Sequence, residues 1–209
     1  MFITTCMRRC LLTALLVCAA PSFAADESMG RPQVRAGDLW VYRQTSLINH
    51  KTDEFSYRVT AAADGRITTD ASGQRDIYST DWNLIESSSG VKISPHEGYF
   101  RFPLAPGMVY PFKAQRTVAR VRAAWEGMVT VGAWETIDVP AGRFRALRVD
   151  VEGHFGGGPV ARRGRMQQSY WWSGEVRRWV RHDLWISKPG GTASDFQTRS
   201  ELIRHTPAP

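Results

Sequence analysis

Alternation of apolar and polar residues dominates the chain after about residue 115 and constrains the fold more than any other feature. Between Thr117 and Val131, small and apolar residues occupy the odd positions, while arginine and glutamate occupy several even ones. A period of two is typical of β-strands with one buried face and one solvated face, whereas helices repeat every 3.6 residues. The run from Thr117 to Val131 is therefore predicted to be a strand, and no segment shows a helical stripe with caps.

A β-hairpin is predicted around Pro140-Ala141-Gly142. These residues separate Thr136–Val139 from Phe144–Phe155, and both flanking runs alternate between apolar and polar residues. Proline fits the second position of a type I turn, and glycine readily adopts the left-handed conformation that follows it.

Further strands are predicted where similar runs are bounded by turn-forming residues. They span Leu39–Ile48, Phe55–Ala62, Arg66–Asp70, Arg75–Tyr78, Trp82–Glu86, Tyr99–Phe102, Met166–Trp172, Val176–Ser187 and Phe196–Ile203. Residues 37–205 are therefore predicted to form a single all-β domain. Its strands are expected to follow one another in an antiparallel meander that forms a curved sheet, a sandwich or a partly open barrel.

Residues 1–24 have the order of a secretory signal peptide, with two arginines, an apolar run at Leu11–Ala20 and small residues at Ser22 and Ala24. We expect cleavage after Ala24 and a periplasmic or secreted mature protein. The apolar run is too short to span a bilayer, and no transmembrane segment is expected after removal of the signal. Cys18 follows Val17 rather than a small residue, which disfavours a lipid anchor.

The mature chain is expected to contain no cysteine, because Cys6, Cys10 and Cys18 all lie in the predicted signal peptide. This excludes a disulfide, a thiolate nucleophile and a cysteine-ligated zinc. Residues 25–36 are expected to be flexible, and residues 206–209 are expected to form a disordered tail. Removal of the signal takes two arginines and no acidic residue, which lowers the formal net charge from +7 to +5. Most of the basic residues are arginines, a bias that a GC-rich genome also produces. No nucleic-acid partner is expected.

Three local patterns span most of the mature chain. They are Gly-Asp-Leu-Trp-Val-Tyr at residues 37–42, Val-Pro-Ala-Gly-Arg-Phe-Arg-Ala at residues 139–146, and Tyr-Trp-Trp-Ser at residues 170–173 followed by Val176 and Val180-Arg181. With these patterns the chain resembles uncharacterised exported bacterial β-proteins of the TapB-like, or domain-of-unknown-function, group. The resemblance implies a curved antiparallel sheet that buries an apolar ligand or a segment of a partner. It implies no catalytic residue.

Metal and catalytic motifs are absent from the sequence. The histidines are His50, His96, His154, His182 and His205, and no two have the spacing of metal ligands on one element. His154 and His182 lie on adjacent or near-adjacent predicted strands and are either a pair or two separate surface residues. The sequence has no Gly-x-Ser-x-Gly motif, and Ser87-Ser88-Ser89-Gly90 has the composition of a turn. We therefore expect no metal, no cofactor and no enzymatic activity.

A glycine-rich segment, Gly156-Gly157-Gly158, precedes three arginines at Arg162, Arg163 and Arg165. A phosphate loop would lead into a helix, whereas this segment leads into a predicted strand. The arginines are either a solvated hairpin tip or a cluster that contacts lipid phosphates.

Tryptophan is concentrated in the C-terminal half of the chain. Six of the eight tryptophans lie there, at Trp125, Trp134, Trp171, Trp172, Trp179 and Trp185. Neighbours in a strand face opposite sides, so Trp171 and Trp172 cannot share one face. Trp134, Trp171, Trp172 and Trp179 are therefore candidate ligand-binding residues, together with the three arginines of the cluster. The alternative is that arginine and tryptophan side chains stack to cover the sheet.

The leading hypothesis is a non-enzymatic periplasmic binding or accessory module for an amphipathic or lipid-like ligand. The alternative is a cell-envelope module that binds another protein through an exposed aromatic face or a sheet edge. An outer-membrane barrel is disfavoured by the short N-terminal strands and by the terminal Pro-Ala-Pro.

Overall fold

The computed structural model describes residues 27–156, 164–187 and 196–209. Within these ranges the chain forms twelve β-strands. They are β1 (Leu39–Ser46), β2 (Thr52–Ala63), β3 (Arg66–Ala71), β4 (Arg75–Ser79), β5 (Leu84–Glu86), β6 (Lys92–Ser94), β7 (Val109–Val118), β8 (Val121–Val139), β9 (Gly142–Gly156), β10 (Gly164–Ser173), β11 (Arg178–Ser187) and β12 (Phe196–Thr206). A helix with the length and apolar character needed to cross a membrane does not occur in this part of the chain.

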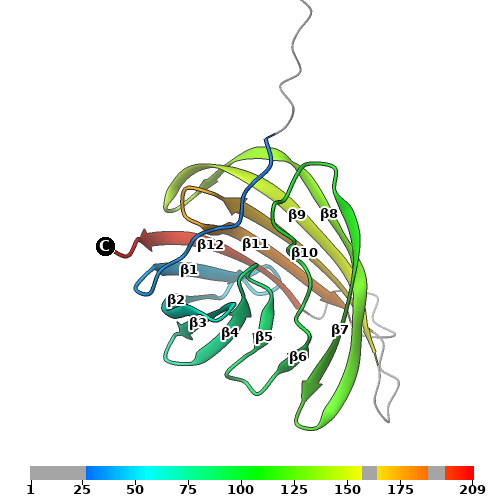
Figure 1. The fold of residues 1–209 in the computed structure, drawn as a ribbon. Helices are drawn as coiled ribbons and strands as arrows, with labels where there is room; N and C mark the ends of the chain where they lie inside the picture. Colours follow the sequence, from blue (N-terminus) through cyan, green and yellow to red (C-terminus); the bar gives the residue numbers. More distant parts are fainter. Residues whose placement is uncertain (1–26, 157–163, 188–195) are drawn as a thin grey trace, which may run out of the picture.

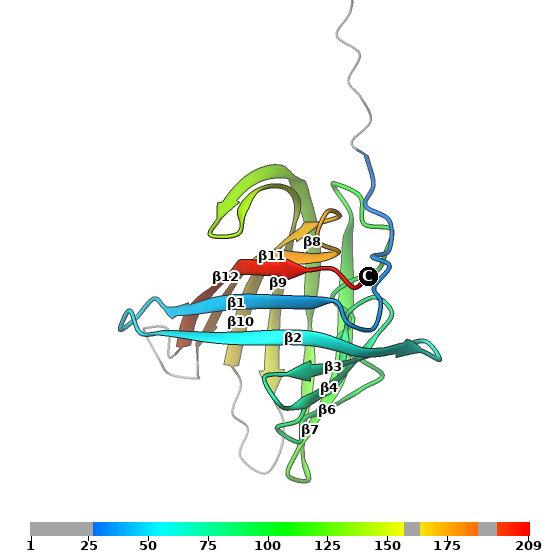
Figure 2. The ribbon, with the colours of Figure 1, turned by 90° about the vertical axis from the view of Figure 1, so that its left-hand side faces the viewer.

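The strands form one closed antiparallel barrel in which each pairs with its neighbours along the chain (Figure 1). The first and last strands complete the closure, because Tyr42 of β1 pairs with Phe55 of β2 on one side and Leu202 of β12 on the other. Figure 2 shows β12, β1 and β2 side by side at this junction. The predicted all-β meander is confirmed, and it forms a closed barrel rather than a sandwich or a partly open one.

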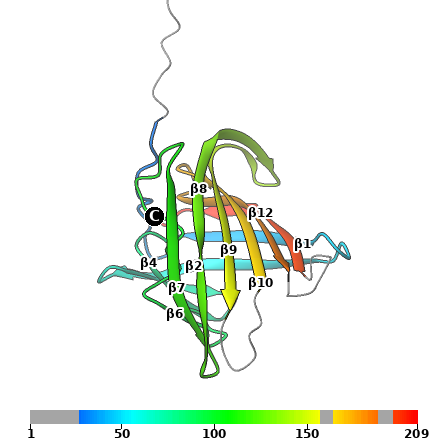
Figure 3. The same ribbon diagram turned by 90° about the vertical axis from the view of Figure 1, so that its right-hand side faces the viewer.

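The predicted hairpin at Pro140-Ala141 is confirmed, and its strands are the longest in the barrel that the structure describes. β8 has 19 residues and β9 has 15, and Val139 pairs with Gly142 beside the turn. The register shifts between Val131 and Trp134, and beyond this point the hairpin curls away from the barrel (Figure 3). Its tip returns to the barrel wall, where the Ala141 N–H donates to the Leu202 carbonyl at 3.0 Å.

Two strand predictions are wrong. Thr117–Val131 is not one strand, because the chain reverses at Ala119 and Arg120, whose φ angles are 47° and 69°. Tyr99–Phe102 contains no strand and belongs to the connection between β6 and β7. The three-residue strand β6 was not predicted.

Side chains of β1 connect two of the three sequence patterns noted above. The Trp40 indole donates to the Val176 carbonyl at 2.7 Å, and the Tyr42 hydroxyl donates to the Trp179 carbonyl at 2.8 Å. These bonds tie β1 to the start of β11, although β12 lies between them in the barrel.

The segments expected to be flexible at the two ends of the domain are partly packed against the barrel. Met29 is 5% exposed and forms an antiparallel bridge with Leu104. At the C-terminus, the Ala208 N–H donates to the fully buried Asp38 carboxylate, which also pairs with Arg177 at 2.8 Å. Burial of Met29 and the bonds to Asp38 place residues of both end segments against the barrel.

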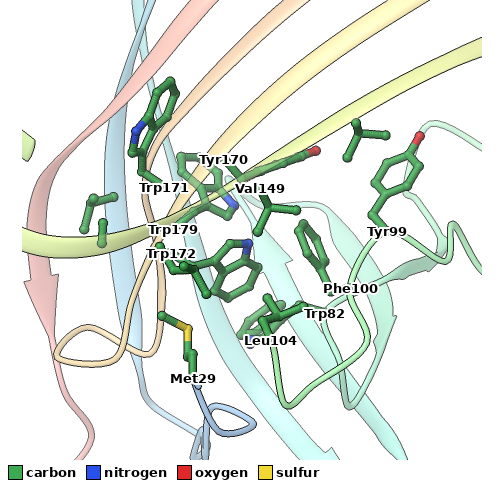
Figure 4. Close-up of a cluster of buried hydrophobic side chains, with 14 of the residues drawn as sticks. Met29, Trp82, Tyr99, Phe100, Leu104, Val149, Tyr170, Trp171, Trp172 and Trp179 are labelled. Atoms are coloured by element: carbon green, nitrogen blue, oxygen red, sulfur yellow. The ribbon is translucent and has the colours of Figure 1, made fainter. Parts of the chain in front are cut away.

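The core fills the barrel with aromatic side chains. Trp172 is fully buried and packs edge-on against Phe100 and Phe102, with ring centroids 4.8 and 5.5 Å away. Figure 4 shows Trp172 and Trp82 close to Phe100 and Leu104. Aromatic rings therefore make up a large part of the barrel interior.

Candidate functional site

Arg178, the first residue of β11, places a guanidinium group among the aromatic residues of the barrel interior. The residue is 3% exposed. The nearest rings are those of Tyr57 and Trp82, each with its centroid 4.1 Å from the guanidinium carbon. Trp40, Trp179 and Tyr78 add three rings at 5.4, 5.6 and 5.8 Å. Aromatic faces attract cations, which partly offsets the loss of hydration of this charge.

The Arg178 guanidinium has no counterion among the residues that the structure describes. Its Nε and Nη1 atoms are buried and have no hydrogen-bond partner there. The preceding residue behaves differently, since Arg177 pairs with Asp38. An unpaired buried charge costs on the order of several kcal/mol, so the Arg178 guanidinium calls for a partner.

A cavity of about 160 Å³ lies beside Arg178 and is called the aromatic cavity below. Its lining comes from strands on both sides of the barrel and from the β4–β5 and β6–β7 connections. The lining residues are Tyr57, Tyr78, Trp82, Leu84, Glu97, Phe100, Tyr170, Trp172, Arg178, Trp179 and His182. Burial raises the pKa of the Tyr57, Tyr78 and Tyr170 hydroxyls, which keeps them protonated at neutral pH.

Gln168 orders the polar groups on the β10–β11 side of this cavity. Its Oε1 accepts from the Tyr170 hydroxyl at 2.7 Å and lies 2.8 Å from His182 Nε2. Burial lowers the pKa of His182 to about 4, so the imidazole is neutral at physiological pH and Nε2 carries the donated hydrogen. The ring also stacks on Tyr170 at 4.2 Å. These bonds fix His182 as a neutral structural group.

A second cavity, of about 330 Å³, adjoins the first and is called the apolar cavity below. Leu84 and Glu97 line both cavities. The remaining lining residues are mostly apolar, namely Val91, Ile93, Trp125, Phe155, Met166, Leu184 and Ile186, with Ser87, Ser89, Arg116 and Gln168 among them. The two cavities are therefore adjacent, one with a mostly apolar lining and one that contains Arg178.

Glu97 stands where the two cavities meet. Its Oε2 accepts from the Leu84 N–H at 3.2 Å, which fixes the carboxyl group in place. Burial raises the pKa of Glu97 to about 7, against smaller opposing effects of the Leu84 hydrogen bond and the Arg116 charge. Near neutral pH this carboxyl group is therefore protonated in a large fraction of molecules.

Two of the four candidate tryptophans lie in the interior, and the other two lie outside it. Trp172 and Trp179 are paired across β10 and β11 and line the aromatic cavity. Trp171 points away from Trp172 (Figure 4) and donates to Glu135 at 2.8 Å. The Arg181 and Arg148 guanidinium groups cover its ring at 4.4 and 5.4 Å. Trp171 is thus covered by arginine stacking, the alternative that the sequence left open.

The other candidates do not join the interior site. Trp134 lies on the curled part of β8, where it donates to the Glu27 carbonyl at 2.7 Å and stacks with Arg145 at 4.0 Å. Arg165 is exposed on β10. Arg162 and Arg163 lie outside the described residues.

His154 and His182 do not form a pair. His154 is exposed on β9, whereas His182 lines the aromatic cavity, so the alternative of two surface histidines is wrong for His182. In the part of the chain that the structure describes, no cluster of histidine, cysteine and carboxylate residues has the arrangement of a metal site.

The sequence did not identify Arg178, Tyr57, Trp82 or Glu97 as site residues. A signal for Arg178 was present, because it has the same parity as Val176 and Val180 in the apolar stripe predicted for β11. A charge on such a stripe calls for a partner. Glu97 gave no comparable signal, because it lies in a connection outside any predicted strand, and Trp82 lies in the β4–β5 connection although it was predicted to begin a strand.

No protein-family model and no curated sequence matches this chain. Solved structures share its fold. A candidate lipoprotein from Parabacteroides distasonis is 11% identical with a TM-score of 0.50, and the match covers 85% of this chain and 97% of that one. A candidate exported protein with a YmcC-like fold from Bacteroides fragilis is 14% identical with a TM-score of 0.50, over 86% and 99% of the two chains.

The hypothetical lipoprotein YmcC from Escherichia coli gives a TM-score of 0.52 at 9% identity, over 84% of this chain and 86% of that one. The chain therefore has the β-barrel fold of YmcC-like exported proteins and lipoproteins. The resemblance to exported bacterial β-proteins is confirmed at this level, whereas the TapB-like label is not found among these structures.

Proposed function

We propose that this protein is a non-enzymatic binding module of the cell envelope that holds an amphipathic small molecule inside its barrel. The observation that carries the proposal is the apolar cavity of about 330 Å³ next to the polar, aromatic cavity that contains Arg178. Binding sites for small molecules are typically concave and mostly apolar, with a few polar groups that orient the ligand. The mouth or interior of a β-barrel is a common place for them.

The outer surface supports the alternative of a protein-binding module less well. In the closed barrel every strand has two neighbours, so the twelve described strands leave no sheet edge for a partner strand. The outward-facing Trp171 is 6% exposed beneath its arginine neighbours. An aromatic docking face would need this ring to be accessible.

Two polar groups of the aromatic cavity are held in place by Gln168. The His182 Nε2 hydrogen is committed to Gln168, which fixes the orientation of the imidazole ring. The Tyr170 hydroxyl is also committed to Gln168. These groups are held in fixed hydrogen bonds, as expected for residues that shape a binding cavity.

Location in the envelope rests on two independent observations. The first 24 residues have the order of a secretory signal peptide. Proteins with the same fold are described as exported proteins or lipoproteins.

The test is a titration of purified protein with N-phenyl-1-naphthylamine, an uncharged probe whose fluorescence rises in apolar surroundings. Wild-type protein should bind it, and Leu184→Trp should weaken binding by about tenfold or more because the indole fills the apolar cavity. Val109→Trp is the matched control, because Val109 is 60% exposed on β7. This control should leave probe affinity unchanged.

Native mass spectrometry of protein released gently from the periplasm provides a second readout, in which a bound amphipathic molecule should add mass to the polypeptide. The proposal is contradicted if the polypeptide mass appears alone and the wild-type protein also fails to bind the probe. Equal weakening by Leu184→Trp and Val109→Trp would place the probe elsewhere and would also contradict it.

A further inference from the structure

The ligand's charge can be inferred from the aromatic cavity. Arg178 is the positive group in its lining, and two of its nitrogen atoms have no partner among the described residues. A guanidinium offers a planar carboxylate two edges, Nε with Nη2 and Nη1 with Nη2, so a carboxylate can accept from one of the two unpaired nitrogens together with Nη2. A ligand with a carboxylate would thus supply an acceptor and the missing counterion.

A cationic ligand fits this cavity poorly. Aromatic cages often bind cations, but here five rings already surround the protein's own guanidinium. A second positive charge would meet Arg178 without intervening water. Glu97 does not compensate fully, because its raised pKa of about 7 leaves it largely protonated in mildly acidic solution.

A singly charged group fits better than a doubly charged one. A phosphate monoester carries between one and two negative charges at neutral pH, whereas a carboxylate carries one. With Arg178 as the single cation in the lining, the second charge of a phosphate would be buried beside Glu97 without compensation.

We propose that the ligand is a monocarboxylate with an apolar chain, bound with its carboxylate at Arg178 and its chain in the apolar cavity. This inference rests on the proposed function and names the chemical class of its ligand. Leu84 and Glu97 line both cavities, so a molecule that occupies both would lie beside these two side chains. Val91, Leu184 and Ile186 then provide the apolar surroundings of the chain.

The experiment compares ligands that share a ten-carbon chain and differ only in their head group. Decanoate, decanol, decyl phosphate and decyltrimethylammonium are each used to displace N-phenyl-1-naphthylamine at a pH below the Glu97 pKa of about 7. Decanoate should bind at least about tenfold more tightly than decanol, because a hydrogen-bonded charge pair contributes this much in a buried site. Decyl phosphate and decyltrimethylammonium should bind more weakly than decanoate.

Variants at Arg178 test whether this arginine causes the preference for decanoate over decanol. Arg178→Gln should remove the advantage of decanoate over decanol while the uncharged probe still binds, which shows that the barrel remains folded. Arg178→Lys should retain part of the advantage, since it keeps the charge but loses the bidentate geometry. Arg165→Gln, a change at an exposed arginine of β10, should leave both affinities unchanged.

Several outcomes would overturn the inference without touching the proposed function. They are equal binding of decanoate and decanol by wild type, tighter binding of decyl phosphate or the ammonium compound, and loss of the preference in Arg116→Gln rather than Arg178→Gln. Arg116 matters here because it lines the apolar cavity and would anchor a ligand in the reverse orientation. Failure of the wild type to bind the uncharged probe would instead count against the proposed function itself.

Discussion

Two parts of the barrel wall are built in different ways. From β7 to β12 the strands have 10 to 19 residues and pair with their neighbours in long ladders. From β4 to β6 the strands have three to five residues, and β5 meets β6 at the Glu86–Lys92 pair. We call these parts the long-strand wall and the short-strand segment, and the latter includes the connection that reaches β7 at Val109.

Hydrogen bonds from side chains hold the short-strand segment in place, whereas backbone hydrogen bonds between strands hold the long-strand wall. The buried Asn83 amide donates to the Phe100 carbonyl at 2.8 Å and accepts from the Phe100 N–H at 2.9 Å. The Tyr110 hydroxyl donates to the Tyr99 carbonyl at 2.8 Å. Freed from ladder pairing, this segment places Trp82 against Arg178 and brings Glu97 into the lining of the same cavity. The site therefore lies where the two kinds of wall meet.

The largest expected effect tests the long-strand wall. Trp172→Ala should lower the free energy of unfolding by about 3–5 kcal/mol, because the fully buried indole leaves a cavity among Phe100 and Phe102. Trp134→Ala removes the same side chain from the half-buried hairpin and should cost clearly less. Urea unfolding of both variants measures the difference. Equal losses of unfolding free energy in the two variants would contradict the view that the core lies in the barrel and not in the curled hairpin.

The next effect concerns the charge in the short-strand segment. Glu97 has a folded-state pKa of about 7 and an ordinary value of 4.5, so the unfolded chain releases this proton at lower pH than the folded chain. The contribution of Glu97 to stability is therefore fully present below about pH 4.5 and is lost as the pH rises through 7. The loss amounts to about 3 kcal/mol at most.

Glu97→Gln should remove this loss. The unfolding free energy of the variant minus that of the wild type should therefore increase as the pH is raised from 4.5 to 8. His182 acts in the opposite direction, because its pKa is lowered to about 4 and its contribution is lost as the pH falls below 6.5. Both proteins contain His182, so the difference between them isolates Glu97. A difference that stays constant with pH would show that the Glu97 pKa is not raised.

A smaller effect tests whether side-chain hydrogen bonds take the place of backbone strand pairing in the short-strand segment. Asn83→Ala should cost about 2–3 kcal/mol, because it leaves the buried N–H and C=O of Phe100 without partners. Hydrogen exchange should accelerate around Phe100 and remain slow in β9, where ladder bonds are intact. Asn83→Asp should cost at least as much as Ala, because a carboxylate at this buried position would face the Phe100 carbonyl without a counterion among the described residues. Uniform acceleration across both regions would argue against local support by Asn83.

The long-strand wall was largely predictable because its residues alternate over long runs. The Pro140-Ala141-Gly142 turn was found because proline and glycine mark the turn conformation. The reversal between β7 and β8 was missed, since Ala119 and Arg120 adopt positive φ angles without glycine, asparagine or aspartate. A tight turn made from such residues looks like the interior of a strand in the sequence.

The site was much less predictable, because it depends on closure of the barrel. Tyr57 comes from β2, Trp82 and Glu97 from the short-strand segment, and Arg178 from β11. Their meeting follows from the register of the whole barrel. The aromatic run at Tyr99–Phe102 resembled a strand, yet Asn83 takes both backbone groups of Phe100 and leaves none for a ladder. Local patterns carry no information about such long-range side-chain bonds.

The smallest expected effect is a gain in stability where the two walls meet. Arg178→Met keeps an apolar stem of similar length and removes a buried charge that has no counterion among the described residues. Replacement of buried charges by apolar groups is often neutral or stabilising, so the ligand-free variant should gain about 1 kcal/mol despite losing contact with five rings. Thermal unfolding without ligand and with decanoate measures this gain and its cost to binding. A large loss of stability would instead mean that the aromatic cage evolved around the guanidinium for packing, and that Arg178 belongs to the wall rather than to the site.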